Sequence, residues 1–272
     1  MKTILTILFL SFLVNSYAQY PRVDIPGSQV RKITSSIVDG QEYELQILLP
    51  GSYGSSNKKY PVVYLMDSQW DFPLVKSIYG QQLYDKFIPE MIIVGITWGG
   101  TKPNYDSLRI RDYSPTHHSS VPQSGGADKF LSFMKNELFP FIESSYPADS
   151  ANRIMMGCSF GGLVTLYAMF SQPKMFSGYV AASPYTGWDN QYIYKFEKDY
   201  FQSNSARPVK LYLTVGDVEP SKPGFEKFVA HLASRNYSAV SIQSKVLENT
   251  GHSGTKSETF GRGLQFYFQK KK

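Results

Sequence analysis

The 272-residue sequence predicts an α/β fold in which a mainly parallel, doubly wound sheet carries helices on both faces within a single domain. Short apolar segments alternate with helical segments along most of the chain, and parallel sheets are built from such strand–helix–strand units. The segment 91–96, Met-Ile-Ile-Val-Gly-Ile, is continuously apolar, which is typical of a strand buried on both faces. The sequence contains neither an internal repeat nor a linker that would divide it into two domains.

The N-terminal part of the sheet is predicted from two segments of mixed alternation, 29–38 and 42–49, with Asp39-Gly40 between them as a hairpin signal. Further strands are expected in short apolar runs at 61–66, 91–96, 153–156, 178–182, 209–215 and 240–247. Helices are expected at 71–87, 127–146, 163–170, 225–231 and 255–269. The segment 98–126 is expected to be a long loop.

Residues 1–18 have the pattern of a secretory signal peptide. Lys2 supplies a positive charge, residues 4–14 form an apolar stretch, and Ser16-Tyr17-Ala18 places small residues at the cleavage positions. The apolar stretch is too short to span a bilayer, and no later segment is apolar enough to do so. We therefore expect a secreted or periplasmic mature domain of residues 19–272, beginning at Gln19.

Composition and charge narrow the function classes. The chain is 42% hydrophobic and 18% charged, which is ordinary for a globular protein. A net charge of +6 permits attraction to anionic partners, but no basic-aromatic motif indicates a nucleic-acid partner. Cys158 is the only cysteine, so an intrachain disulfide is impossible. The oligomeric state is not encoded in any readable pattern.

The segment Gly157-Cys158-Ser159-Phe160-Gly161 predicts a nucleophilic serine. It lies between the apolar run 153–156 and the helical run 163–170, which is the strand–turn–helix context of a nucleophile elbow. The turn crowds the positions two before and two after the serine, where glycine fits most easily. The alternative is a glycine-rich turn whose serine only caps the helix. Cys158 is expected to be a small residue that points away from the site.

Two histidines follow Ser159 and are candidates for its general base. His231 lies within the predicted helix 225–231, whereas His252 lies in a loop between the last strand and the last helix, where the base belongs. The acid is expected after the strand 209–215, where Asp217 and Glu219 compete. Glu219 is preferred because, three residues beyond Gly216, it has the reach to accept from an imidazole N–H.

The oxyanion hole requires two backbone N–H groups. One is expected from Phe160, and the other from the loop after the strand that ends at Asp67, at Ser68 or Gln69. No metal or organic cofactor is expected, because acyl transfer by a serine and a histidine needs neither. His117-His118 could bind a metal ion, but it has no acidic or thiol partner at useful spacing.

Two other features have both a structural and a functional interpretation. Arg111-Asp112 is expected to be a buried ion pair, with a pocket wall as the alternative. The aromatic segment 188–201 predicts either an aromatic-accepting pocket or helical core packing.

These motifs together resemble the putative-esterase family of α/β-hydrolases, which includes enterochelin-type siderophore esterases, feruloyl esterases and mycolyltransferases. The resemblance extends over most of the mature chain and is carried by the segments 60–67, 111–115, 157–162, 183–184, 216–219, 251–253 and 261–264. The sequence departs from the family at Asp67-Ser68, where Asp-Gly is frequent.

The resemblance implies that Ser159 is the nucleophile, His252 the base, and Glu219 or Asp217 the acid. Together with the predicted signal peptide, it implies an exported serine esterase acting on a small-molecule or carbohydrate-linked ester, such as a siderophore, a feruloyl or acetyl ester, or a small aryl ester. Two alternatives remain: acyl transfer to an alcohol on the same scaffold, and a non-catalytic binding protein with a hydrolase fold.

Overall fold

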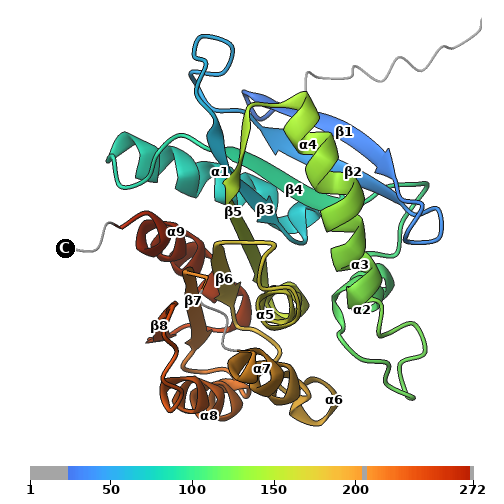
Figure 1. Cartoon of the computed structure of the whole chain (residues 1–272), viewed down its shortest axis with the longest axis vertical. Helices are drawn as coiled ribbons and strands as arrows, with labels where there is room; N and C mark the ends of the chain where they lie inside the picture. The colour runs from blue at the N-terminus through green and yellow to red at the C-terminus, as the bar shows by residue number, and fades with distance from the viewer. Residues whose placement is uncertain (1–23, 204–206, 270–272) are drawn as a thin grey trace, which may run out of the picture.

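A computed structural model describes residues 24–203 and 207–269 of the chain. In that part, eight strands form one sheet in the order β1-β2-β4-β3-β5-β6-β7-β8 (Figure 1). The strands are β1 Ser28–Thr34, β2 Glu42–Leu48, β3 Tyr60–Leu65, β4 Ile92–Trp98, β5 Ala148–Cys158, β6 Gly178–Ala182, β7 Val209–Gly216 and β8 Val240–Leu247. The predicted signal peptide, residues 1–18, lies outside the described residues.

The sheet is parallel except at one edge. β1 and β2 form an antiparallel hairpin, and β2 also pairs antiparallel with β4. Every other neighbouring pair, from β4–β3 to β7–β8, is parallel. The hairpin signal at Asp39-Gly40 is confirmed, because both residues have the positive φ angles, 44° and 77°, that such a turn requires. The predicted mainly parallel, doubly wound sheet is therefore present.

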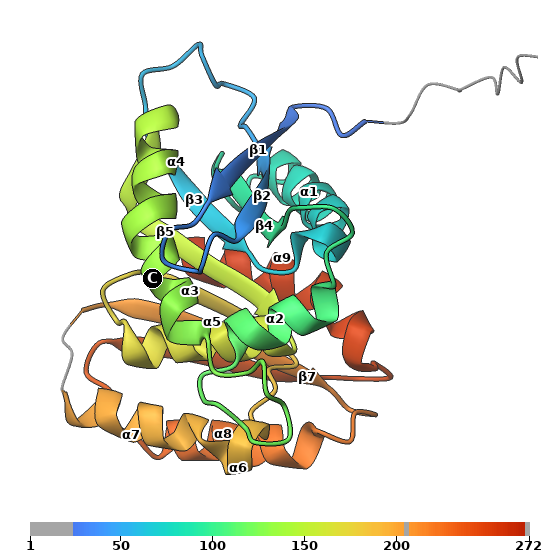
Figure 2. The ribbon, with the colours of Figure 1, turned by 90° about the vertical axis from the view of Figure 1, so that its right-hand side faces the viewer.

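Helices cover both faces of the sheet (Figure 2). Side chains of α1 (Ser68–Tyr84) and α9 (Thr255–Phe268) pack on one face, in a cluster with β3, β4 and β5. The opposite face is covered by the remaining helices: α2 Tyr105–Tyr113, α3 Ala127–Phe133, α4 Phe139–Ser145, α5 Phe160–Ser171, α6 Trp188–Gln191, α7 Ile193–Gln202 and α8 Lys222–Ala233. No helix of the described residues is both long and apolar enough to cross a membrane.

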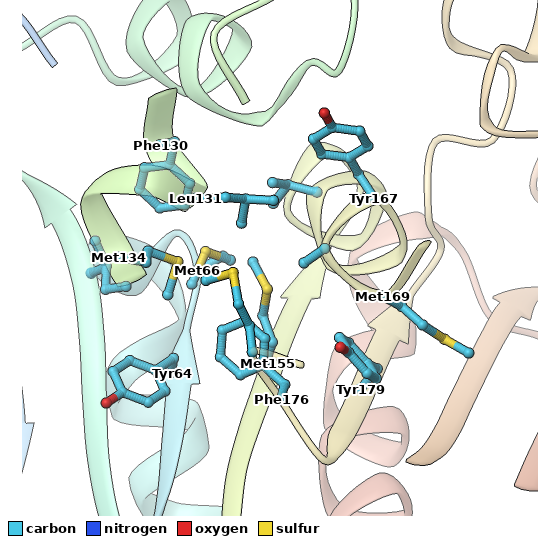
Figure 3. Packing of buried hydrophobic residues seen from close by; sticks show 14 of the residues in the cluster. Tyr64, Met66, Phe130, Leu131, Met134, Met155, Tyr167, Met169, Phe176 and Tyr179 are labelled. Carbon is cyan, nitrogen blue, oxygen red and sulfur yellow. The ribbon is translucent and has the colours of Figure 1, made fainter. Parts of the chain in front are cut away.

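The larger core cluster lies between the central strands and α3, α4 and α5. Figure 3 shows Tyr64 and Met66 of the β3 segment facing Met155 of β5 and Phe176. The Tyr64 ring lies 4.9 Å from Phe139 and 5.9 Å from Phe176, centre to centre. Each fully buried side chain of this size contributes about 1.5–3 kcal/mol to folding, so the core supplies stability that no disulfide can provide here.

The predicted loop 98–126 is partly wrong, because it contains the helix α2. The helix begins after Asn104, whose side-chain oxygen accepts from the N–H of Ser107 at 3.1 Å. Asp106 in its first turn and Pro115 beyond its end are the matching sequence signals. The polar stretch 105–113 lacks a regular apolar stripe, which is why periodicity did not reveal it.

The predicted helix 127–146 is present with an irregular centre. A π-helical turn, Met134–Leu138, separates α3 from α4. Pro140 lies in the first turn of α4, and a proline cannot supply the N–H that a regular α-helix would use there. The turn therefore accommodates the proline without breaking the helical path.

A buried ionic cluster joins α7 to α8. The carboxylate of Glu197 is fully buried and accepts hydrogen bonds from His231, Arg235 and Tyr237. Glu197→Ala is expected to lower the free energy of unfolding by about 3 kcal/mol, because three donors lose their common acceptor. Urea denaturation would measure this change.

Glu226→Ala is the matched control for the Glu197 variant. Glu226 lies on the solvent side of α8 and pairs with Lys222 at 3.9 Å. Exposed pairs contribute little, so this variant is expected to unfold at nearly the same urea concentration as the parent protein. Equal losses in both variants would show that burial does not distinguish the two carboxylates.

Candidate active site

A crevice lies beyond the carboxyl ends of the parallel strands. After β3 the chain continues to β4, which is the neighbour of β3 on one side, and it later enters β5, which is the neighbour of β3 on the other side. The loops that follow β3 and β5 therefore diverge. Ligands of open α/β sheets bind at such a switch point. The crevice has a volume of about 320 Å³, and its lining includes Asp67, Trp70, Arg109, Ser159, His252 and Lys256. A larger cavity of about 580 Å³ at the opposite edge contains none of the predicted site residues.

Ser159 lies on a strained turn between β5 and α5. Its φ and ψ angles are 59° and −117°, a backbone conformation that residues other than glycine rarely adopt. A Cβ atom on Gly157 would lie 2.5 Å from the backbone of Gly161, so a side chain there would displace the turn. The Ser159 N–H donates to the carbonyl of Ala182 at 3.0 Å, which ties the turn to β6. This is the geometry expected of a nucleophile elbow.

His252 and Glu219 are hydrogen-bonded to each other. The Nδ1 atom of His252 lies 2.7 Å from Oε2 of Glu219. The other carboxylate oxygen accepts from the Ser183 hydroxyl at 2.6 Å and from the Gly216 N–H at 2.7 Å. His252 is half-exposed at the crevice, whereas Glu219 is buried behind it. The carboxylate is therefore fixed, and it orients the imidazole.

Asp217 lies close by but makes different contacts. Its two carboxylate oxygens accept the backbone N–H groups of Asn249, at 3.0 Å, and Thr250, at 3.1 Å. These residues begin the loop that carries His252. A Cβ atom on Gly216 would lie 1.9 Å from the carbonyl oxygen of Thr250, so the two loops are in close contact. Of the two competing carboxylates, the structure brings Glu219 to His252. Asp217 instead binds the start of the loop that carries His252.

The electrostatic environment keeps Glu219 ionised. Burial acts to raise the pKa of this carboxyl, but the hydrogen bonds from Ser183, Gly216 and His252 outweigh burial, and the pKa lies below its usual value. By linkage, the carboxylate stabilises the fold above the usual glutamate pKa, and that contribution is lost as the pH falls through the lowered value.

The predicted oxyanion donors lie on two different helices. Phe160 is the first residue of α5 and follows Ser159 directly. Ser68 is the first residue of α1, and its side chain is fully buried against β4 and not part of the crevice lining. The role of its backbone N–H stays a prediction, whereas the preceding residue, Asp67, does line the crevice.

Cys158 lies beside Ser159 as a buried thiol. Its side chain packs with the apolar cluster between the sheet and α1 and α9. Burial raises the pKa of this thiol to about 12, so it is protonated at neutral pH. The expectation that it is a small residue without a nucleophilic role agrees with this environment.

Several charged crevice residues were not found from the sequence. Arg109 of α2 makes a two-point ion pair with Asp67, and Lys256 of α9 pairs with Asp71 of α1 at 2.7 Å. Arg109 lies four residues before Tyr113, which places both side chains on one face of a helix. This spacing could have indicated Arg109, but only if the helix α2 had been predicted.

The other singled-out residues are structural. The Asp112 carboxylate is fully buried and accepts from Tyr43, Trp98 and Arg111, as expected for a buried ion pair. Within the segment 188–201, Ile193 and Tyr200 are core residues.

Over residues 35–250 the chain matches the model of the family described as "Putative esterase". It is 31% identical over 211 residues to ferri-bacillibactin esterase BesA of Bacillus subtilis, an alignment that covers 72% of each chain. The siderophore triacetylfusarinine C esterase of Aspergillus fumigatus is 25% identical over 214 residues, which cover 75% of this chain and 73% of the relative. Among solved structures, the BES protein from Bacillus cereus has a TM-score of 0.83 at 23% identity, covering 93% of this chain and 99% of its own.

The fold is that of the α/β-hydrolases, and the crevice lies where these proteins carry their sites. The chain belongs to the family described as "Putative esterase" and is an ester hydrolase of the serine type.

Proposed function

We propose that the chain is an exported esterase that cleaves siderophore esters, with Ser159, His252 and Glu219 carrying out the acyl transfer. One observation carries this proposal: His252, held at 2.7 Å by the buried Glu219, lines the same crevice as the strained Ser159. A base oriented by a fixed carboxylate beside a partly exposed serine is the arrangement that activates a hydroxyl.

The proposed reaction has two acyl-transfer steps. His252 takes the proton of the Ser159 hydroxyl as its oxygen attacks the ester carbonyl. Backbone N–H groups, with Phe160 as the first donor and Ser68 as the second, bind the oxyanion of the tetrahedral intermediate. His252 then protonates the leaving alcohol, and a water molecule, deprotonated by His252, releases the acid from Ser159. Glu219 stays ionised and stabilises the imidazolium.

Aromatic side chains around Ser159 support a substrate with aromatic rings. Trp70 lines the crevice and is 47% exposed, and Tyr185, 42% exposed, packs edge-on against Phe160 at 5.3 Å. Tyr185 is held beside the nucleophile because its N–H donates to the Ser159 carbonyl at 3.1 Å. Flat rings such as those of catecholate siderophores would stack on these faces.

Purified protein lacking residues 1–18 would test the proposal against a panel of esters. Enterobactin and its ferric complex, triacetylfusarinine C, methyl ferulate and acetylated xylan would be compared by kcat/KM. We expect a siderophore ester to give the highest value. In the same experiment we expect a fluorophosphonate probe to label Ser159, which mass spectrometry would detect. Failure of both hydrolysis and labelling would favour a binding protein, and turnover of ferulate or xylan alone would reassign the substrate.

Trp70→Ala is expected to raise the KM for an aromatic siderophore ester by roughly three- to tenfold, because a stacked aromatic pair contributes about 0.5–1.5 kcal/mol. Hydrolysis of vinyl acetate, which has no aromatic ring to stack on Trp70, is expected to change little. Tyr84→Ala is the control, since Tyr84 lies at the far end of the same helix and is 87% exposed. Equal effects of the two substitutions on KM would argue against a platform at Trp70.

Export is part of the proposal and has its own test. If residues 1–18 are a signal peptide, the chain recovered from outside the cytoplasm of the expressing cells begins at Gln19. N-terminal sequencing of that material would decide, and an intact Met1 would contradict the proposal.

A further inference from the structure

Arg109 connects the two loops that form the crevice. Its guanidinium donates to both carboxylate oxygens of Asp67, at 3.0 and 2.7 Å, and to the carbonyl oxygen of Cys158 at 3.4 Å. It also lies over the Phe160 ring, 5.5 Å from the ring centre. Asp67 follows β3, whereas Cys158 and Phe160 flank Ser159. A single side chain from α2 therefore contacts both sides of the site.

The backbone of Asp67 is held as firmly as its side chain. Asp67 adopts a left-handed conformation, with φ and ψ angles of 54° and 39°, at the residue that turns the chain from β3 into α1. Its N–H donates to the hydroxyl of the fully buried Tyr113 at 3.3 Å. Tyr113 and Arg109 are four residues apart on α2, so one face of this helix binds both the backbone N–H and the carboxylate of Asp67.

The conformation of Asp67 sets the direction of the amides that follow it. The Asp67 carbonyl accepts from the N–H groups of Trp70, at 3.0 Å, and Asp71, at 3.3 Å. The N–H groups of Ser68 and Gln69, in the first turn of α1, have no carbonyl four residues earlier within the helix. These two amides are the candidates for the second oxyanion donor, because the N–H of Asp67 is already used by Tyr113.

The ion pair is also close to the nucleophile. A Cβ atom on Gly161 would lie 3.0 Å from Oδ2 of Asp67, so the carboxylate rests directly on the first turn of α5. The side chains of Asp67 and Arg109 are only 3% and 14% exposed. Burying such a pair adds little net stability, because the lost hydration offsets most of the attraction. A left-handed aspartate costs further free energy. The arrangement is better explained by a geometric requirement than by stability.

We propose that Arg109 is a positioning residue for the oxyanion hole: it holds Asp67 in the left-handed conformation that aims the first amides of α1 at the same point as the Phe160 N–H. The inference rests on the proposed role of Ser159 as nucleophile. It adds that a residue with no part in proton transfer controls the stabilisation of the oxyanion.

Arg109→Gln tests the inference with p-nitrophenyl acetate, a small neutral ester that offers no charge for Arg109 to bind. We expect kcat to fall roughly a hundredfold with KM within about twofold, since loss of one oxyanion donor has effects of this size. Asp67→Asn is expected to have a similar effect, and the double variant no greater one, because both substitutions break the same pair. Arg109→Lys is expected to recover only part of the rate, since lysine cannot bind the carboxylate at two points.

Arg111→Gln is the matched control. Arg111 lies on the same helix and pairs with the buried Asp112 at 2.7 Å, but it does not line the crevice. It is expected to lower the melting temperature without lowering kcat of the folded fraction, which active-site labelling would quantify. The ratio of kcat/KM for the ester to that for its thiono analogue adds a second readout, because sulfur accepts the oxyanion-hole hydrogen bonds poorly. This ratio is expected to fall in Arg109→Gln and to stay constant in Arg111→Gln.

Three outcomes would overturn the inference or its basis. If Arg109→Gln loses rate only in proportion to its folded fraction and keeps the ester-to-thionoester ratio, the pair is structural. If it raises KM for anionic esters alone, Arg109 binds substrate and does not position the oxyanion hole. If Ser159→Ala is as active as the parent protein, the proposed function itself fails, and the Arg109 result then has no bearing on an oxyanion hole.

Discussion

Replacing Ser159 with alanine is expected to lower kcat for p-nitrophenyl acetate by a factor on the order of a million. Without the hydroxyl no acyl-enzyme forms, and only binding and the oxyanion donors remain to assist attack by water. Alanine fits the turn because the side chain is removed beyond Cβ while the glycines that relieve crowding, Gly157 and Gly161, are kept. The melting temperature is therefore expected to stay close to that of the parent protein. Initial rates with excess enzyme, together with a thermal melt, would measure both quantities.

His252→Ala provides the internal check on this result. Because the serine and its base act as one unit, the double variant is expected to be no slower than the slower of the two single variants. Additive losses would mean that Ser159 and His252 act in separate steps. A Ser159→Ala protein with parental turnover would remove the nucleophile assignment altogether.

Glu219→Gln is expected to reduce kcat roughly ten thousandfold, comparable with the loss when a triad aspartate becomes an amide. The amide cannot stabilise the imidazolium, and it can present its NH₂ group to Nδ1 of His252, which favours the wrong tautomer. The carboxylate contacts from Ser183 and Gly216 would also be weakened. Steady-state hydrolysis of p-nitrophenyl acetate would measure the change.

Asp217→Asn is the control for the Glu219 variant, because the sequence offered both carboxylates for the same role. Asp217 accepts backbone N–H groups of the His252 loop, and asparagine keeps one acceptor oxygen for them. Its kcat is expected to stay within a few-fold of the parent value. The reverse order of effects would make Asp217 the acid and contradict the assignment of Glu219.

Most of the fold could be predicted from the sequence because its signals are local. β6 and β8 have the predicted bounds, and β2, β3, β4 and β7 lie within one or two residues of theirs, since each is a short apolar run between turn residues. β1 ends four residues before its predicted end, and β5 begins five residues before its predicted start, in the polar stretch 148–152. The helix α2 was not predicted because its buried residues are confined to Asp112 and Tyr113 near its end, so the sequence shows no apolar stripe there. The π-helical turn of 134–138 escaped because helical periodicity continues through it.

The site could be predicted in part for the same reason. The glycines around Ser159 and the reach of Glu219 beyond Gly216 are local constraints, and the placement of His252 follows from chain order. The ion pair of Arg109 with Asp67 joins residues 42 positions apart, and the sequence around either residue contains no pattern that indicates the other as its partner. Such a contact depends on how α2 crosses the end of β3, which only the three-dimensional arrangement contains.

The neighbouring residues Cys158 and Ser159 bear on the chemical selectivity of the protein. The thiol is shielded and protonated, so reagents that require a thiolate find no reactive partner there. The less acidic hydroxyl, one residue further along the chain, is the group presented to the crevice. An oxidising environment would therefore leave the sulfur, and with it the strand end that supports the turn, chemically unchanged. Covalent reagents distinguish the two residues by burial, even though sulfur is the stronger nucleophile in water.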